Sequence, residues 1–183
     1  MLIYFLGCDC CGKDTLMHEL AKKYDYRFYM SPRSPICNIV YDTIYDRTPS
    51  RSFKENLKLI SGFLKLGAYF VLIEVDPNEL LRRAKQRNEK HVSDLETFKE
   101  HIAIYNKTFV MCKKEFPQFE GRFLKVDNTT DINKSVSKIK RKIDRDMMQD
   151  CKVLNKKVVE VLKKLDKEIR KETTSKKRGK YGV

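Results

Sequence analysis

The chain has 183 residues, of which 41% are hydrophobic and 35% charged, so it is long enough for one domain with an appendage and too apolar for a disordered protein. Lysine and arginine outnumber acidic residues by 39 to 25, and a net charge of +14 indicates an anionic partner such as a nucleotide or nucleic acid. The first apolar run, 1–6, is too short to cross a membrane and lacks the features of a signal peptide. The six cysteines are not spaced like a disulfide framework. We therefore expect a soluble cytoplasmic protein with reduced thiols and no membrane partner.

Strand and helix patterns alternate along residues 1–150. Short apolar runs predict strands at 2–6, 27–30, 39–45, 68–73 and 123–126. Apolar side chains at helical spacing predict helices at about 16–24, 53–64, 77–90, 98–105 and 132–143. This alternation predicts an α/β fold with three layers, α/β/α, around a central, mostly five-stranded parallel sheet.

Residues 151–183 form a distinct basic segment. They contain 12 basic and 4 acidic residues, a local charge of +8, which leaves only +6 for residues 1–150. Val158, Leu162, Leu165 and Ile169 have helical spacing, so we expect an amphipathic helix that frays from Ser175 onward. The charge favours weak nucleic-acid binding, and packing of the apolar stripe on the body is the alternative. We thus predict two parts, a domain at 1–150 and a helical basic extension at 151–183.

The turn after the first predicted strand carries the strongest functional signal. It reads Gly7, four residues, then Gly12-Lys13 at the start of a helix, which is the pattern and setting of a phosphate-binding loop. The glycines let backbone N–H groups curl around phosphate oxygens, and the lysine adds a positive charge. We expect the ATP phosphates to be bound by Gly7, Cys10, Cys11, Gly12, Lys13, Asp14 and Thr15. An ordinary turn with a solvated lysine is the alternative.

The position after Lys13 departs from the usual pattern, in which a Ser or Thr hydroxyl binds Mg²⁺. Here Asp14 stands at that position and Thr15 follows it. Either the Asp14 carboxylate takes the metal, or Thr15 does so in a shifted frame, or metal binding is weakened. The clustered Cys8, Cys10 and Cys11 do not predict zinc, because side chains of a curled loop cannot converge on one ion.

The run from Gly7 to Thr15, Gly-x-Asp-x-x-Gly-Lys-x-Thr, resembles the loop of thymidylate kinases and related deoxynucleoside monophosphate kinases. Three later segments resemble the same family in the same order: Ser31-Pro-Arg33, Asp46-Arg47 after the strand predicted at 39–45, and the strand and proline at 71–77 followed by Arg83 and Arg87. The resemblance covers about residues 1–145. It implies a P-loop NTPase fold with a lid around 82–95.

The resemblance also implies an activity. It implies an ATP- and Mg²⁺-dependent phosphotransferase of nucleotide biosynthesis, a homodimer, that transfers the γ-phosphate to a (deoxy)nucleoside monophosphate. Such transfer needs positioning and charge neutralisation more than proton transfer. The implied roles are catalysis by Lys13, Arg47, Arg83 and Arg87, acceptor binding by Asp9, Arg33, Arg47 and Tyr105, and metal binding by Asp14 and Asp46, with Asp42 as a rival. Residues 127–129 are interpreted as a loop against the adenine base.

Two other functions stay open. A kinase for a nucleoside or polynucleotide 5′-hydroxyl would need a general base, and no Glu-Arg pair of the kind that nucleoside kinases carry follows the second predicted strand. A non-catalytic nucleotide- or nucleic-acid-binding protein on a degenerate P-loop fold would have little reason to keep a lysine and four arginines together. These residues are Lys13, Arg33, Arg47, Arg83 and Arg87.

Overall fold

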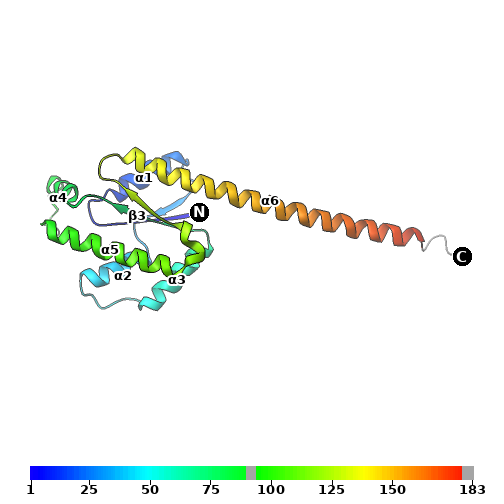
Figure 1. Cartoon of the computed structure of the whole chain (residues 1–183), viewed down its shortest axis with the longest axis horizontal. Helices are drawn as coiled ribbons and strands as arrows, with labels where there is room; N and C mark the ends of the chain where they lie inside the picture. The colour runs from blue at the N-terminus through cyan, green and yellow to red at the C-terminus, as the bar shows by residue number, and fades with distance from the viewer. Residues whose placement is uncertain (90–93, 179–183) are drawn as a thin grey trace. The chain divides into compact units, whose positions relative to one another are not determined.

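The computed structural model describes residues 1–89 and 94–178, with the backbone alone from residue 166 onward. The chain forms two compact units, the first of which spans Met1–Lys140 and the second of which begins at Arg141. The first unit is built around a four-stranded parallel sheet in the order β2-β1-β3-β4 (Figure 1). The strands are β1 (Leu2–Leu6), β2 (Tyr29–Ser31), β3 (Tyr69–Glu74) and β4 (Phe123–Asp127).

Helices cover both faces of this sheet, which gives the three expected layers. Figure 1 shows α2, α3 and α5 on one side of the strands, and α1 with the start of α6 on the other. The helices are α1 (Lys13–Lys23), α2 (Pro35–Ile44), α3 (Phe53–Lys65), α4 (Pro77–Gln86), α5 (Leu95–Glu115), the 3₁₀ helix η1 (Pro117–Arg122) and α6 (Ile132–Arg178). Because both faces are covered, the central strands β1 and β3 are almost entirely apolar and buried.

The parallel register fixes where the polar loops gather. Ile3 of β1 pairs with Tyr69 of β3, and Phe70 of β3 pairs with Phe123 of β4. All strands therefore end at the same edge of the sheet, and the loops that follow β1, β3 and β4 lie together there. In open α/β sheets this edge is where ligands bind.

The strand predicted at 39–45 is wrong, because residues 35–44 form helix α2. Ser34 begins the helix: its side chain accepts hydrogen bonds from the backbone N–H groups of Ile36 at 3.2 Å and Cys37 at 3.4 Å. Pro35 stands at the first helical position, where its missing N–H costs nothing. A short apolar run is ambiguous between a buried strand and a buried helix, and here the cap and the proline decide. The sheet consequently has four strands instead of five, and β2 pairs directly with β1.

The other predicted elements are found within a few residues of their expected bounds, with three differences. The helix predicted at 98–105 is α5, which runs from Leu95 to Glu115 and so ends ten residues past the expected end. Helix α4 ends at Gln86, before the expected residue 90, and Asn88 has a left-handed φ of 53°. Residues 90–93 of the expected lid lie outside the described residues. The helices predicted at 132–143 and in the basic extension are one 47-residue helix, α6, because no Gly or Pro interrupts it; it continues to Arg178 instead of fraying from Ser175.

The second unit is the continuation of α6 from Arg141. Large apolar side chains are solvent-exposed along it, among them Leu154, Val158 and Leu162. Even so, no helix in the described part of the chain is both long enough and apolar enough to cross a membrane.

The cap of α2 gives a stability prediction. Ser34→Ala removes the side-chain acceptor of two backbone N–H groups, so we expect a loss of about 1 kcal/mol of unfolding free energy. For a chain of this size that corresponds to a melting temperature roughly 2–4 °C lower. Ser61→Ala, within α3, is the matched control and should leave the melting temperature unchanged. Equal melting temperatures for the Ser34 variant and the wild type would contradict the role of Ser34.

Candidate functional site

The loop between β1 and α1 has a conformation that only particular residues allow. Gly7 has a φ of 142° and Gly12 a φ of 85°, both of which favour glycine. A Cβ added to Gly7 would lie 2.8 Å from the backbone oxygen of Ile73, and one added to Gly12 would lie 2.8 Å from Nδ2 of Asn128. The two glycines of the motif are therefore required by close approach of the neighbouring strands as well as by backbone conformation.

Helix α1 begins directly after this loop, and its first backbone N–H groups have no side-chain cap. Gly12 is the N-cap of α1 and offers no side-chain cap. The first N–H groups of a helix have no intrahelical acceptor and lie at the positive end of the helix dipole. Together with the curled loop, this arrangement suits phosphate oxygens.

Lys13 folds back over the loop. Its Nζ donates hydrogen bonds to the carbonyl oxygens of Gly7 and Cys8, both at 2.8 Å, and lies 3.8 Å from Sγ of Cys11. Burial lowers the pKa of Lys13, but its neighbours, Cys11 first, raise it by more, so the pKa lies above its ordinary value. The ammonium is therefore charged at neutral pH and held within the curl.

The three loop cysteines are buried and uncharged at neutral pH. Burial, with a smaller contribution from Cys11, raises the pKa of Cys8 to about 12. Burial also raises the pKa of Cys10 and of Cys11. Among the described residues, no group of three or more His, Cys, Asp or Glu side chains could hold a metal ion.

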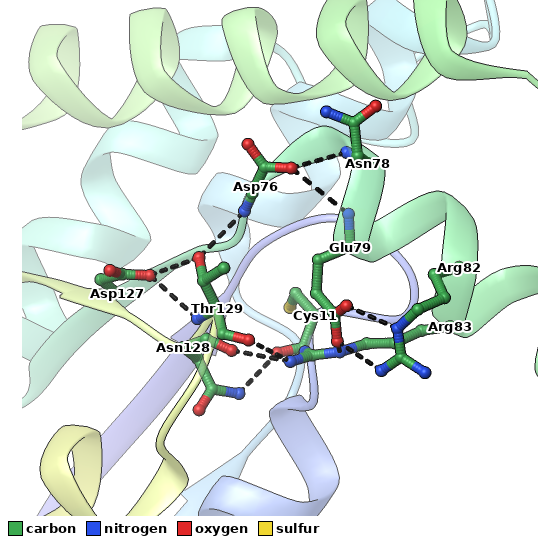
Figure 2. Close-up of polar contacts among 9 residues, drawn as sticks. All are labelled: Cys11, Asp76, Asn78, Glu79, Arg82, Arg83, Asp127, Asn128 and Thr129. Atoms are coloured by element: carbon green, nitrogen blue, oxygen red, sulfur yellow. Dashed lines mark hydrogen bonds and ion pairs between the residues drawn. The ribbon is translucent and has the colours of Figure 1, made fainter.

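Asn128 connects the loop to the end of β4, as Figure 2 shows. Its Nδ2 donates a hydrogen bond to the carbonyl oxygen of Cys11 at 2.9 Å, and its backbone N–H donates to the carbonyl oxygen of Glu74 at 2.8 Å. One residue thus ties the phosphate loop to the ends of β3 and β4. The side-chain amide of Asn128 is thus held by the loop, and the interpretation of residues 127–129 as a loop against the adenine base stays a prediction.

Arg83 joins helix α4 to the same point (Figure 2). Its NH2 donates to the carbonyl oxygens of Asn128 at 2.9 Å and Thr129 at 3.0 Å, and its Nε donates to Glu79 at 2.7 Å. Hydrogen bonds from Arg82, and then from Arg83, lower the pKa of Glu79 to about 2. Glu79 is therefore ionised at any pH at which the protein is handled, and it orients the Arg83 guanidinium.

A third set of contacts fixes the start of α4. Asp76 caps the helix by accepting a hydrogen bond from the backbone N–H of Asn78 at 2.9 Å. The backbone N–H of Asp76 donates to Oγ1 of Thr129 at 3.0 Å, and that hydroxyl donates to Asp127 at 2.6 Å. Hydrogen bonds from Thr129 lower the pKa of Asp127. The loops after β3 and β4 are thus locked together beside the phosphate loop.

Two pockets open at the loop. The first pocket, of about 350 Å³, is lined by Cys10, Gly12, Thr15, Arg82, Arg83, Gln86, Arg87, Asn128, Thr130 and Ile132. The second pocket, of about 360 Å³, is lined by Asp9, Cys10, Gly12, Lys13, Asp14, Thr15, Pro32, Arg33, Tyr41, Arg87 and Glu89. Both pockets share the loop, Thr15 and Arg87, so Arg87 lies where the two meet.

Most of the predicted site residues lie at these pockets. The loop, Asp9, Arg33, Arg83 and Arg87 are brought together although they come from separate parts of the sequence. Tyr105 is buried in α5, where burial first and then Cys37 and Tyr41 raise its pKa. Tyr41, which the sequence did not single out, lines the second pocket instead.

Asp46 and Arg47 line neither pocket. Because α2 replaces the predicted strand, Asp46 follows the end of a helix, with a φ of 45°, and not a strand end at the site. The Arg47 guanidinium lies 4.6 Å from the ring centre of Tyr45, and both residues are exposed. The rival metal ligand Asp42 lines neither pocket either. The expected place of Asp46 and Arg47 at the end of a strand is therefore wrong, and their contact with the phosphates stays a prediction.

The lining residues that sequence reasoning missed share one property. They lie in α2, at the end of α4 or just after it, or at the start of α6 or just before it, and no sequence motif marks them: Tyr41, Gln86, Glu89, Thr130 and Ile132. The one available signal was the register of α4, in which the predicted Arg83 and its neighbours Gln86 and Arg87 lie on one face.

The glycine contacts give a testable contrast. Gly12→Ala should cost about 1–3 kcal/mol of unfolding free energy, because a positive φ and the Asn128 amide both oppose a Cβ. Gly62→Ala, in α3, meets nothing within 4 Å and should stabilise the protein by about 0.5–1 kcal/mol. Thermal or urea unfolding of both variants measures the difference. A Gly12 variant as stable as the wild type would show that the loop is not held as described.

Comparison with protein-family models gives no match, and neither does comparison with curated proteins. Among solved structures, the chain is similar to the YorR protein of Bacillus subtilis, which was crystallised in complex with phosphorylated GDP. The likeness covers 81% of this chain and 98% of YorR, with a TM-score of 0.64 and 16% sequence identity. The two proteins therefore share a fold, an α/β arrangement of parallel strands and helices compatible with a P-loop protein.

Proposed function

We propose that this chain is a P-loop phosphotransferase that transfers the γ-phosphate of ATP to a (deoxy)nucleoside monophosphate, in the manner of thymidylate kinases. The observation that carries the proposal is the pair of similar-sized pockets that meet at one phosphate loop, with Arg87 lining both. A nucleotide as ligand is also supported by the fold shared with YorR, whose structure holds phosphorylated GDP.

The first pocket suits the phosphoryl donor. The uncapped start of α1 faces the phosphates, and Arg82, Arg83 and Arg87 provide positive charge. Arg83 uses Nε and NH2 on Glu79 and the β4 loop, while its NH1 lies 3.9 Å from the place of a Gly12 Cβ. Arg83 thus reaches the loop already oriented, which favours electrostatic stabilisation without reorganisation.

Lys13 supplies charge at the bond that breaks. Two of its three N–H groups are bound to the carbonyl oxygens of Gly7 and Cys8. The third faces the Cys11 sulfur at 3.8 Å, a weak acceptor that a phosphate oxygen replaces at little cost. The ammonium is therefore placed to meet the β- and γ-phosphates with little movement.

The second pocket suits the acceptor. Arg33 and Arg87 are available for the acceptor phosphate, which is itself the nucleophile and needs no general base. The Tyr41 ring forms a flat wall, and Asp9 is an acceptor for a sugar hydroxyl, as the family resemblance implies. Arg87, shared by both pockets, neutralises charge on the phosphoryl group as it passes between them.

The oxygen atoms at the loop fit Mg²⁺. Thr15 lines both pockets and Asp14 lines the second, while Asp46 lines neither. Mg²⁺ characteristically keeps several waters and binds through one or two protein oxygens plus substrate phosphates, so this small set is sufficient. When bound, the ion neutralises phosphate charge. Asp14 and Thr15 are the residues that hold it in this proposal.

Two substitutions on α4 and the loop test the assignment. Lys13→Ala should lower phosphoryl transfer at least 100-fold, and Arg87→Ala should lower kcat more than it raises KM, because Arg87 acts on the transferred group. Lys85→Ala, exposed on α4 and away from both pockets, is the control and should leave both constants unchanged. The assay supplies ATP and a panel of monophosphates. Turnover above a tenth of wild type in the Lys13 variant would overturn the loop assignment.

The same assay separates the other functions. The carboxylates Asp9 and Glu89 line the second pocket, where either offers a general base for a hydroxyl acceptor. Transfer to nucleosides or to 5′-hydroxyl oligonucleotides, with none to monophosphates, would identify that second candidate. Nucleotide binding without transfer to any acceptor would identify a non-catalytic P-loop protein.

Because Asp14 carries a carboxylate, we expect nucleotide affinity to depend unusually strongly on Mg²⁺. A carboxylate beside a triphosphate repels it unless a cation lies between them, so nucleotide affinity should fall more steeply on Mg²⁺ removal than in the Asp14→Ser variant. We expect the variant to stay active. Titration of ATP affinity against Mg²⁺ for both proteins measures this. Equal binding by the wild type in the presence of a chelator would show that Asp14 does not hold the metal.

A further inference from the structure

The part of α6 in the second unit carries a regular apolar seam that no part of the proposed function uses. Apolar residues recur at alternating spacings of four and three: Met147, Cys151, Leu154, Val158, Val161 and Leu165. All six are exposed, Leu154 to 61% and Val161 to 56%. This spacing averages 3.5 residues, the repeat of a coiled-coil seam with Met147 at a d position and Cys151 at an a position.

We propose that α6 from Met147 to Leu165 docks a second copy of this chain in a parallel, two-stranded coiled coil. The proposal goes beyond the phosphotransferase function and does not rest on it.

The pattern of charge favours a helix as the partner. Between Met147 and Leu165 no seam position is charged, while the charged side chains occupy other positions: Asp150, Lys152, Lys156, Lys157, Glu160, Lys163 and Lys164. A membrane-surface helix needs a wide apolar face, whereas a narrow stripe that follows the 3.5-residue repeat stays in contact with another helix along its length. Outside the seam the exposed apolar side chains of this segment are Met148 and Leu162 at e positions, Val159 at b and Val153 at c, so they form no second continuous stripe.

The identity of the seam residues favours a second copy in parallel register. Paired in register, the seam places each residue against its twin, so apolar side chains meet throughout. Lys157 and Lys164 stand at g positions, and Asn155 and Leu162 at e positions. In a parallel pair Lys157 faces Leu162 of the second copy, which its aliphatic stem covers. Asp150 also stands at a g position, so in an antiparallel pair it would face Lys164 while Lys157 would face its twin. The parallel orientation therefore rests on the cover of Leu162 by Lys157, and Cys151 tests it.

Residue shape favours two strands over more. A β-branched residue at a with Leu at d is the combination that favours dimers, and Val158 and Leu154 supply it at the centre of the seam. The seam spans about three heptads, which is short for a coiled coil. The dimer should therefore dissociate on dilution.

Cross-linking through Cys151 tests whether the two helices are parallel and in register. Among the six cysteines it alone is exposed, since the structure buries Cys8, Cys10, Cys11, Cys37 and Cys112. In the parallel pair two Cys151 side chains face each other across the seam. Diamide, by accepting two electrons and two protons, should then join the two thiols in one disulfide.

The experiment measures the mass of the full chain by sedimentation equilibrium over a dilution series. We expect twice the monomer mass at high concentration, and loss of the dimer in Val158→Glu but not in Val159→Glu. The two valines are adjacent and equally exposed, at 47% and 49%, but only Val158 lies on the seam. Diamide should cross-link the wild type and not a Cys151→Ser, Lys156→Cys variant, whose thiol points away from the seam.

Each other outcome overturns the proposal. A monomer mass at every concentration would show that the chain does not bind a second copy of itself. Binding of that monomer to anionic phospholipid vesicles or to an oligonucleotide would then identify the class of partner. A dimer that survives Val158→Glu uses another surface, and one lost equally in both valine variants is not specific to the seam. A trimer or tetramer overturns the two-stranded state. A dimer that diamide fails to cross-link through Cys151 overturns the parallel register.

Discussion

The close approach of Gly12 to the amide of Asn128 is the contact on which the site depends. The space between them leaves no room for a Cβ, and the same amide holds the carbonyl oxygen of Cys11. Through Asn128 the loop is tied to Glu74 at the end of β3 and to Arg83 on α4. A single buried residue, through its side chain and its backbone, therefore connects the elements that form the first pocket, and the loop conformation follows from the sheet instead of from the loop alone.

The arginines around the site differ in the contacts that hold them in place. Arg83 is partly neutralised by Glu79 and anchored by backbone oxygens, so its position is set in advance. Arg33 and Arg87 line the pocket walls. A cation whose position is fixed in advance stabilises phosphate charge without reorganisation. Positive charge outweighs the carboxylates Asp9, Asp14 and Glu89 across the two pockets only modestly, which is consistent with a metal ion completing the balance.

Sequence reasoning succeeded where structure is local and failed where it is not. The strand, turn and helix that carry the Gly7–Lys13 motif were predictable because the glycines, the lysine and the flanking elements are neighbours in the chain. Helix α2 was mistaken for a strand because a short apolar run has no clear period, and that error carried Asp46 and Arg47 to the wrong place. The contact between Asn128 and Cys11 joins residues 117 positions apart, so only the fold could show it.

The burial of the loop thiols lowers their reactivity under oxidative stress. Thiolates are the species that peroxide and electrophiles attack, and a thiol whose pKa is raised to about 12, as that of Cys8 is, is almost never a thiolate at neutral pH. A phosphate loop containing three cysteines would otherwise be easily inactivated. The burial of Cys8 and Cys11 therefore also protects the loop from covalent damage, and it leaves Cys151, on α6, as the one exposed thiol.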